Sequence, residues 1–279
     1  MATVIGNPGR YAIERSIQVL QRMLLTTMLF LIGIGVIEGL VLASLFSRFL
    51  LSPWVVIAAQ IVLAVLAWRL CAAQSQRIDR YERERLNWKS GAEGECVVAS
   101  VLDGLPKGFV VFHDFNTAQG NFDHVVVGPT GIFALETKNF RGTIAAGADG
   151  ELVRDGVPAS QPYVKQFVRR IMAVREKLTG LAGYEVFIQG VMVFPKARVQ
   201  AKFGSTQSVR CLREGRLYDY LTDTKWGRKL TPEQVDVFRR AFTEIARTDR
   251  DFSGTALAGV QRKGATNATV GLPSCSPVS

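Results

Sequence analysis

Two long apolar runs near the start of the 279-residue chain restrict most strongly what it can fold into. The first covers residues 23–46 and the second residues 50–68, with only Ser47, Arg48 and Phe49 between them. A helix needs roughly 20 apolar residues to cross a bilayer, and both runs reach that length. We therefore expect residues 23–69 to form two transmembrane helices, joined as a tight antiparallel hairpin in a lipid bilayer.

Arginines mark the open side of this hairpin. One arginine, Arg48, lies in the turn, whereas eight flank the two runs on the other side: Arg10, Arg15, Arg22, Arg69, Arg77, Arg80, Arg83 and Arg85. Short cytoplasmic segments beside membrane helices carry an excess of Lys and Arg. The pattern predicts a multi-pass protein of the bacterial inner membrane, with both termini and the soluble part in the cytoplasm. A cleavable signal peptide is not expected, because the apolar run is too long for one.

The rest of the chain divides into four segments by composition. Residues 1–22 read as a cytoplasmic N-terminal segment, and residues 70–89 as a charged juxtamembrane helix with opposite charges three and four positions apart. Residues 90–250 are long enough for one soluble domain with its own core. Residues 251–279 are rich in Gly, Ala, Ser, Thr and Pro without periodicity, which predicts a disordered tail.

The soluble domain has the pattern of an α/β fold. We expect a helix at 91–105, a strand at 109–115, a β-hairpin at 121–138, a short strand at 143–144, a helix at 161–178, strands at 184–194 and 208–212, and helices at 215–221 and 231–246. In the helix at 161–178, apolar residues three and four positions apart predict the buried face: Val164, Phe167, Val168, Ile171 and Val174. This order predicts a mixed β-sheet flanked by helices.

The hairpin carries two acids and a lysine. Strand side chains alternate between faces, so Glu136 and Lys138 share one face. With a two-residue turn at 129–130, Asp123 faces Glu136 with Cβ atoms about 5 Å apart. With Gly131 in the bulge of a three-residue loop, the register shifts by one residue and Asp123 moves to the other face. Two carboxylates so close repel each other unless a cation lies between them, so the first alternative predicts a divalent-metal site.

Charge and composition restrict the partners. The formal net charge of +10 fits a polyanionic partner, either nucleic acid or anionic lipid. The four cysteines form no CxxC pair and have no histidine at zinc-ligand spacing, so a structural zinc site is not expected. The two histidines, His113 and His124, disfavour chemistry that needs several histidines, and we interpret His124 as structural.

These motifs together resemble a known family. Gly91-x-x-Gly-Glu95, then the run FDHVVVGPTGIF at 122–133, then ETKN at 136–139 and Gly142 resemble the nuclease-related domain, NERD, a branch of the PD-(D/E)xK nuclease superfamily. The resemblance covers roughly residues 90–221, and Phe122 departs from the aliphatic residue usual at its position. It implies a PD-(D/E)xK nuclease-like mixed β-sheet flanked by helices, here preceded by the two-helix transmembrane hairpin.

The resemblance also implies roles for five residues. Asp123 and Glu136 correspond to the metal-binding acids of the superfamily, and Lys138 to the lysine that activates the attacking water and stabilises developing charge. Glu95 corresponds to the helix-borne acid, as a direct or indirect metal ligand. Gln166 corresponds to the family's glutamine near the site, although residues 160–163 match the preceding motif only in part.

Hard oxygen ligands favour Mg²⁺ or Mn²⁺ over zinc. Exposed basic residues could then hold a nucleic-acid backbone without sequence preference: Lys107, Arg141, Arg154, Lys165, Arg169 and Arg170. The predicted function is a membrane-anchored, metal-dependent nuclease that hydrolyses phosphodiester bonds of cytoplasmic nucleic acid, with DNA favoured. The resemblance also suggests a homodimer. The alternative is a non-catalytic, membrane-tethered module that keeps the fold and binds nucleic acid or protein.

Overall fold

The computed structural model describes residues 1–46, 53–200, 209–225 and 228–261. The chain forms two compact units. One contains residues 11–89, and the other contains residues 1–10 together with the chain from Ser90 onward.

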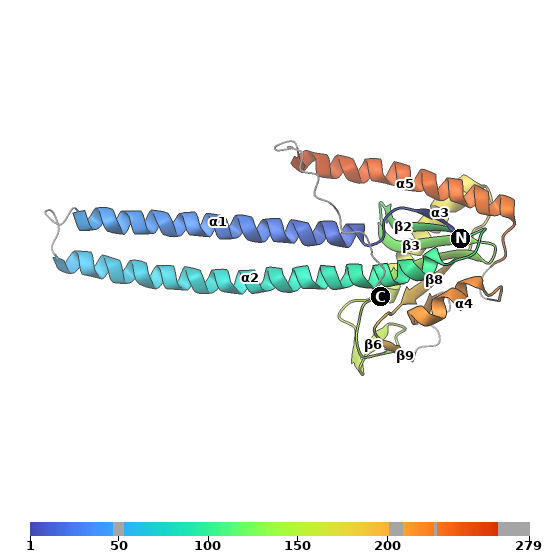
Figure 1. The fold of residues 1–279 in the computed structure, drawn as a ribbon, viewed down its shortest axis with the longest axis horizontal. Helices are drawn as coiled ribbons and strands as arrows, with labels where there is room; N and C mark the ends of the chain where they lie inside the picture. The colour runs from blue at the N-terminus through green and yellow to red at the C-terminus, as the bar shows by residue number, and fades with distance from the viewer. Residues whose placement is uncertain (47–52, 201–208, 226–227, 262–279) are drawn as a thin grey trace. The chain divides into compact units, whose positions relative to one another are not determined.

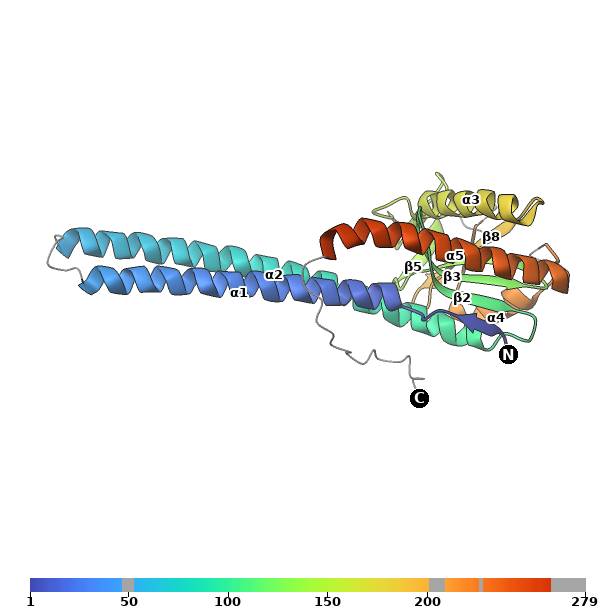
Figure 2. The same cartoon turned by 90° about the horizontal axis from the view of Figure 1, so that it is seen from above.

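The first unit consists of two long helices. Helix α1 (Arg10–Phe46) and the first part of helix α2 (Pro53–Asp103) run alongside each other (Figures 1 and 2). At one end of the pair, the rings of Tyr11 and Trp88 meet edge to face, with centroids 6.0 Å apart. Among the described residues, one stretch, Arg10–Leu40, is long and apolar enough to cross a membrane, and no residue of its apolar 18-residue window is buried. This helix could anchor the protein to a membrane.

The helical unit differs from the sequence prediction at several points. Helix α1 begins at Arg10 rather than near residue 23. The charged segment 70–89 and the helix at 91–105, which we predicted as separate, are parts of the continuous α2. A glycine inside a helix costs only about 1 kcal/mol, so Gly91 and Gly94 do not break it. The turn at 47–49 and the start of the second apolar run lie outside the described residues.

The second unit is built on a six-stranded mixed sheet, in the order β1-β2-β3-β4-β8-β10. The strands are β1 (Thr3–Ile5), β2 (Val110–Thr117), β3 (Gly120–Gly128), β4 (Gly131–Thr137), β8 (Ile188–Val193) and β10 (Val209–Leu212). Strands β2, β3 and β4 are antiparallel, whereas β8 runs parallel to both β4 and β10. The prediction of a mixed α/β fold is confirmed, and it fits a nuclease-like domain.

Helices cover both faces of this sheet. Helices α3 (Tyr163–Ala182) and α5 (Pro232–Gln261) lie on one face (Figure 2). Their buried side chains, among them Phe167 and Phe242, pack on Phe112 and Phe122 of the sheet. The other face packs against the last turns of α2 and against α4 (Leu217–Thr222), which follows a 3-10 turn at Glu214–Arg216.

A smaller sheet lies beside the main one. It has the order β7-β6-β5-β9 and consists of β5 (Thr143–Ala146), β6 (Leu152–Arg154), β7 (Val157–Pro158) and β9 (Arg198–Val199). At the C-terminal end, α5 continues to Gln261, so the first part of the segment predicted as a disordered tail is helical. No proline interrupts residues 233–261, so nothing in the backbone chemistry stops the helix earlier. Residues 262–279 lie outside the described residues.

The N-terminal residues form an edge strand of the main sheet, which the sequence did not predict. Strand β1 pairs in parallel with β2, and Thr3 lies opposite Val110. The main-chain amides of Ala2 and Thr3 donate to the carbonyls of Leu105 and Phe109, both at 2.9 Å. The residues before α1 and those after Lys89 therefore build one domain, and the two long helices are an insertion within it.

Gly6 shows how closely this N-terminal segment approaches the sheet. Its φ is +94°, and a Cβ atom there would lie 2.4 Å from the main-chain oxygen of His113. We expect Gly6→Ala to lower the free energy of unfolding by about 2 kcal/mol, because it adds both backbone strain and a clash with main-chain atoms. Thermal unfolding of the full chain in detergent measures the change.

Gly215→Ala is the matched control, because a Cβ atom at Gly215 would have no neighbour within 4 Å. We expect it to shift the unfolding midpoint little. Equal midpoints for the two variants would contradict the close packing of residues 3–6 on β2.

Candidate functional site

The hairpin of β3 and β4 has the two-residue turn, and the first sequence alternative is confirmed. Gly128 pairs with Gly131, and His124 pairs with Leu135. At the open end of the hairpin, the main-chain amide of Thr137 donates to Oδ2 of Asp123 at 2.5 Å. This hydrogen bond holds the Asp123 carboxylate beside the end of β4, where Glu136 and Lys138 lie.

Glu136 is buried, with 7% of its surface exposed, and has two cationic partners. Lys138 Nζ donates to Oε1 at 2.8 Å, and Nη2 of Arg170 lies 3.0 Å from Oε2. Burial alone would raise the pKa of Glu136, but the charges of Lys138 and Arg170 outweigh it and hold the pKa below its usual value. Glu136 is therefore a buried carboxylate that stays charged.

The pKa values of Asp123 and Glu95 are raised, in contrast to that of Glu136. Burial, and then the negative charge of Glu136, raise the pKa of Asp123 to about 7. Burial, and then the charges of Asp123, Asp114 and Glu136, raise the pKa of Glu95 to about 9. The helix-borne acid and the two hairpin acids are thus close enough to repel one another, which is the arrangement that a bound cation would relieve.

Asp114 is a fourth acid, which the sequence analysis did not select. It is buried on β2 with φ +52°, and its Oδ1 accepts a hydrogen bond from Asn121 Nδ2 at 2.8 Å. The paired residues of β2 and β3 on either side of it are His113 with His124 and Phe115 with Phe122. The signal in the sequence was an acid inside an otherwise apolar strand, where an unpaired carboxylate is costly.

His113 and His124 form a buried pair. Their Nδ1 atoms lie 2.7 Å apart, and His124 has no exposed surface. Burial lowers the pKa of both rings. One neutral ring can donate to the other across this distance, so the geometry agrees with a structural role for His124.

The residues that sequence reasoning placed on α3 do not all reach the acids. Gln166 is exposed on the helix surface, whereas Arg170, one turn further along, contacts Glu136. Arg170 also donates to the carbonyl of Asn121, and its guanidinium lies over the rings of Phe122 and Phe167, at 5.5 and 5.6 Å. The other five residues of the predicted backbone-binding set are exposed: Lys107, Arg141, Arg154, Lys165 and Arg169.

Glu151 holds the N-terminus of α3. It is buried, and its two carboxylate oxygens accept hydrogen bonds from the main-chain amides of Val164 and Lys165, at 3.0 and 2.9 Å. These are amides that the helix itself cannot satisfy, and a negative charge at this end also favours the helix dipole. Glu151 therefore fixes the helix that carries Arg170.

Replacing Glu151 with Ala should lower the free energy of unfolding by roughly 1–2 kcal/mol, the usual cost of losing a helix cap. Glu176→Ala, at an exposed position of the same helix, is the control and should change it little. Chemical unfolding of both variants measures the difference. A Glu151→Ala variant as stable as the control would show that the cap contributes nothing.

Carboxylate oxygens are the ligands that Mg²⁺ and Mn²⁺ prefer. Among the described residues, no group of three or more His, Cys, Asp or Glu side chains is arranged to hold a metal ion. Both carboxylate oxygens of Glu136 already face cations, with Lys138 at Oε1 and Arg170 at Oε2. The carboxylates of Glu95, Asp123 and Glu136 fit a divalent cation in their chemistry, and a cation bound at Glu136 would compete with these two contacts.

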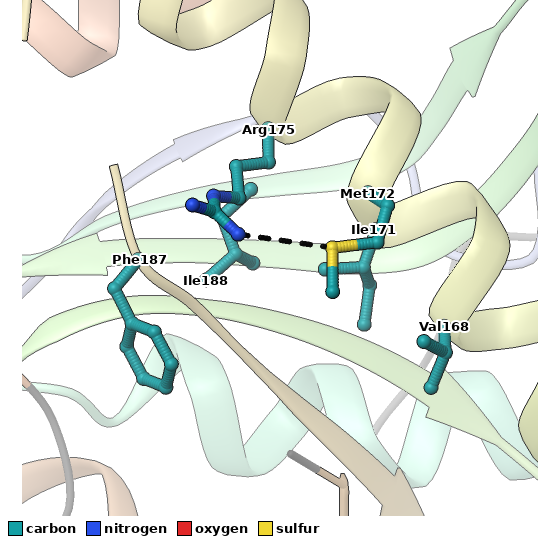
Figure 3. A pocket seen from close by; sticks show the side chains of 6 residues that line it. All are labelled: Val168, Ile171, Met172, Arg175, Phe187 and Ile188. Carbon is teal, nitrogen blue, oxygen red and sulfur yellow. Dashed lines mark hydrogen bonds between the residues drawn. The ribbon is translucent and has the colours of Figure 1, made fainter. Parts of the chain in front are cut away.

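A pocket separate from these acids lies beside α3 (Figure 3). It is lined by Val168, Ile171, Met172, Arg175, Phe187 and Ile188. Its single charged side chain, Arg175, is already held by Glu185 at 2.9 Å. The pocket contains none of the candidate site acids and does not extend the site.

Comparisons with known proteins give a family match for part of the second unit. Residues 90–195 match the family model of the nuclease-related domain, NERD. This range contains the three acids, Lys138, Gln166 and Arg170, and it suggests a nuclease-related function.

The chain is also similar to an uncharacterized protein of Bacillus anthracis, with 41% identity over 63 residues. That match covers 20% of this chain and 29% of the relative, so the chain spans less than a third of the relative's length. No solved structure matches the chain.

Proposed function

We propose that the protein is a membrane-anchored, divalent-metal-dependent nuclease that cleaves phosphodiester bonds, with DNA as its favoured substrate. One observation carries the proposal. Within the segment that matches the nuclease-related domain, Asp123, Glu136 and Glu95 converge at the end of one hairpin, beside Lys138. Sequence-distant acids that raise each other's pKa are costly to a fold and are typical of functional sites.

Asp123 and Glu136 would hold the cation, with Glu95 beside them. A bound Mg²⁺ or Mn²⁺ supplies charge that polarises a phosphate oxygen and lowers the pKa of a water molecule. Lys138 stays protonated, because the charges of Glu136 and Asp123 raise its pKa against the effect of burial. Its ammonium group would stabilise the negative charge that develops on the phosphate during attack.

The apolar helix supports a membrane anchor, and the strand pairing of the N-terminal residues bears on how often the chain would cross. Residues 1–10 and the chain after Lys89 build one domain, so both must lie on the same side of any membrane that α1 crosses. The chain must then cross an even number of times between them, which favours a second span at residues 50–68. The arginines on the open side favour the cytoplasm as the location of the domain.

Topology is tested by labelling single cysteines in intact cells with a reagent that does not cross the inner membrane. Cysteines in place of Ala2 and Lys107 should stay unlabelled until the cells are broken, whereas a cysteine in place of Ser47 should react from outside. Opposite behaviour at Ala2 and Lys107 would contradict the shared compartment.

The nuclease proposal is tested with the full chain in detergent. Single- and double-stranded DNA and RNA are incubated with it in Mg²⁺, in Mn²⁺ and in EDTA. We expect cleavage with either metal and none in EDTA. No cleavage of any substrate by a folded, metal-loaded chain would overturn the proposal.

The alternative is a binding module without catalysis. It is favoured by the internal neutralisation of Glu136, whose charge is already balanced by Lys138 and Arg170. The same preparation distinguishes the two, because a binding module retains nucleic acid in a filter assay, with or without metal, and releases it uncut.

A further inference from the structure

We propose that Arg170 is an exchangeable counter-charge: its guanidinium neutralises Glu136 while the metal is absent, and turns to a phosphate oxygen of the bound strand when the metal is present. The inference rests on the proposed nuclease function and adds a residue to its site. We predicted from the sequence that Arg170 holds the nucleic-acid backbone; the contact with Glu136 is new.

The position of Arg170 is the first observation. Nη2 lies 3.0 Å from Oε2 of Glu136, and 19% of the arginine side chain is exposed. The contact is an ion pair between one guanidinium nitrogen and one carboxylate oxygen, and the other oxygen, Oε1, is held by Lys138. A contact of this kind is easier to displace than a bidentate pair, in which both nitrogens hold both oxygens.

The support behind the guanidinium is the second observation. It lies over the rings of Phe122 and Phe167, and it donates to the carbonyl of Asn121. Phe167 is on α3 itself, and Phe122 precedes the site acid Asp123 in β3. The two rings keep the guanidinium at the acids even when its ion pair with Glu136 is lost. Arg170 is thus also held by contacts with two aromatic rings and the Asn121 carbonyl, which do not depend on Glu136.

Electrostatics then sets the direction of the exchange. A divalent cation at Glu136 and Asp123 would repel a guanidinium that shares the same oxygen. A phosphate arriving at the metal offers a new anionic partner, and the planar fork of arginine matches phosphate oxygens well. Lys138 would keep its hydrogen bond to Glu136 Oε1 at 2.8 Å. The lysine therefore stays in place while Arg170 moves.

The first test measures Mn²⁺ affinity calorimetrically, with the full chain and without nucleic acid. Arg170→Ala removes a competing positive charge, so we expect it to bind Mn²⁺ roughly tenfold more tightly than the unaltered chain, equivalent to about 1.4 kcal/mol. Arg175→Ala is the matched control, because Arg175 lies on the same helix, is paired with Glu185 and belongs to neither the acids nor the predicted backbone-binding set, and it should stay within about twofold.

If Arg170 had only a structural role, Arg170→Ala would bind Mn²⁺ more weakly than the unaltered chain, not more tightly. Loss of packing would loosen the site and weaken Mn²⁺ binding, and thermal unfolding shows whether the variant is folded. Arg170→Lys keeps the positive charge, and we expect it to bind Mn²⁺ as the unaltered chain does. Unchanged or weaker binding by Arg170→Ala, or no Mn²⁺ binding by any form, would overturn the exchange.

The second test measures binding of a fluorescent oligonucleotide by anisotropy, in a Lys138→Met background that should not cut it. With Mn²⁺, Arg170→Ala should weaken binding about tenfold, whereas in EDTA it should change binding less than twofold. Equal losses with and without metal would overturn the proposed exchange. A chain that shows this metal-dependent difference but never cleaves DNA would remove the nuclease function and leave the exchange intact.

Discussion

Replacing Asp123 with Asn, or Lys138 with Met, should lower the rate of metal-dependent cleavage by roughly 100- to 1000-fold. Asp123→Asn removes one of the two charges that would hold the cation, while the amide keeps the shape of the side chain and can still accept from the Thr137 amide. Lys138→Met removes the ammonium group at the site and leaves Glu136 with Arg170 as its cationic partner. Single-turnover cleavage rates with Mg²⁺ and with Mn²⁺ measure the effect.

Lys165→Ala is the control for these two variants. Lys165 is exposed on α3, and it would at most contact a phosphate, so its loss should weaken binding uniformly and leave the single-turnover rate at saturation unchanged. Cleavage that persists in both Asp123→Asn and Lys138→Met would place the chemistry elsewhere or assign it to a contaminant.

A second large effect is expected in the dependence of stability on pH and metal. The metal-free protein should lose unfolding free energy as the pH rises from about 4 to about 9, because of these acids. The folded state keeps the proton of Asp123 to about pH 7 and that of Glu95 to about pH 9. In the unfolded chain both protons leave near the ordinary values of 3.8 and 4.5. The folded state therefore binds more protons across this window, and raising the pH favours unfolding.

Mg²⁺ should reverse this loss, because a bound cation stabilises the ionised acids in the folded state alone. The unfolding midpoint at pH 8.5 should then rise with Mg²⁺ concentration, and at pH 4.5 it should respond much less. Glu95→Gln is the informative variant, since it removes the acid with the largest pKa rise and should flatten the metal-free pH profile. A profile of Glu95→Gln as steep as that of the unaltered chain would contradict the raised pKa of Glu95 in the folded state.

Local sequence patterns predicted the elements of the soluble domain well. The helix expected at 161–178 is α3, and four of its five predicted inward residues are buried: Val164, Phe167, Ile171 and Val174. The sequence left two hairpin registers open, and the pairing of Gly128 with Gly131 selects the two-residue turn at 129–130. Short-range periodicity and turn geometry are properties of the chain itself.

Element boundaries were less predictable. We predicted a break within α2 and an earlier end of α5, and both predictions are wrong, because composition shifts and single glycines do not stop a helix that contains no proline. The edge strand β1 was missed for a different reason. Three residues near the N-terminus show no periodicity, and they form a strand only because the exposed edge of β2 offers main-chain partners.

The candidate site, like the fold, depends partly on local sequence patterns and partly on contacts between distant segments. Strand alternation alone predicts that Glu136 and Lys138 share a face, and the family resemblance adds Asp123 and Glu95 as candidates. That Arg170 rather than Gln166 reaches Glu136, and that Asp114 adds a fourth acid, depends on the packing of distant segments. The angle and depth at which α3 packs, and a single residue with positive φ in β2, depend on contacts between segments far apart in the chain, which local patterns do not encode.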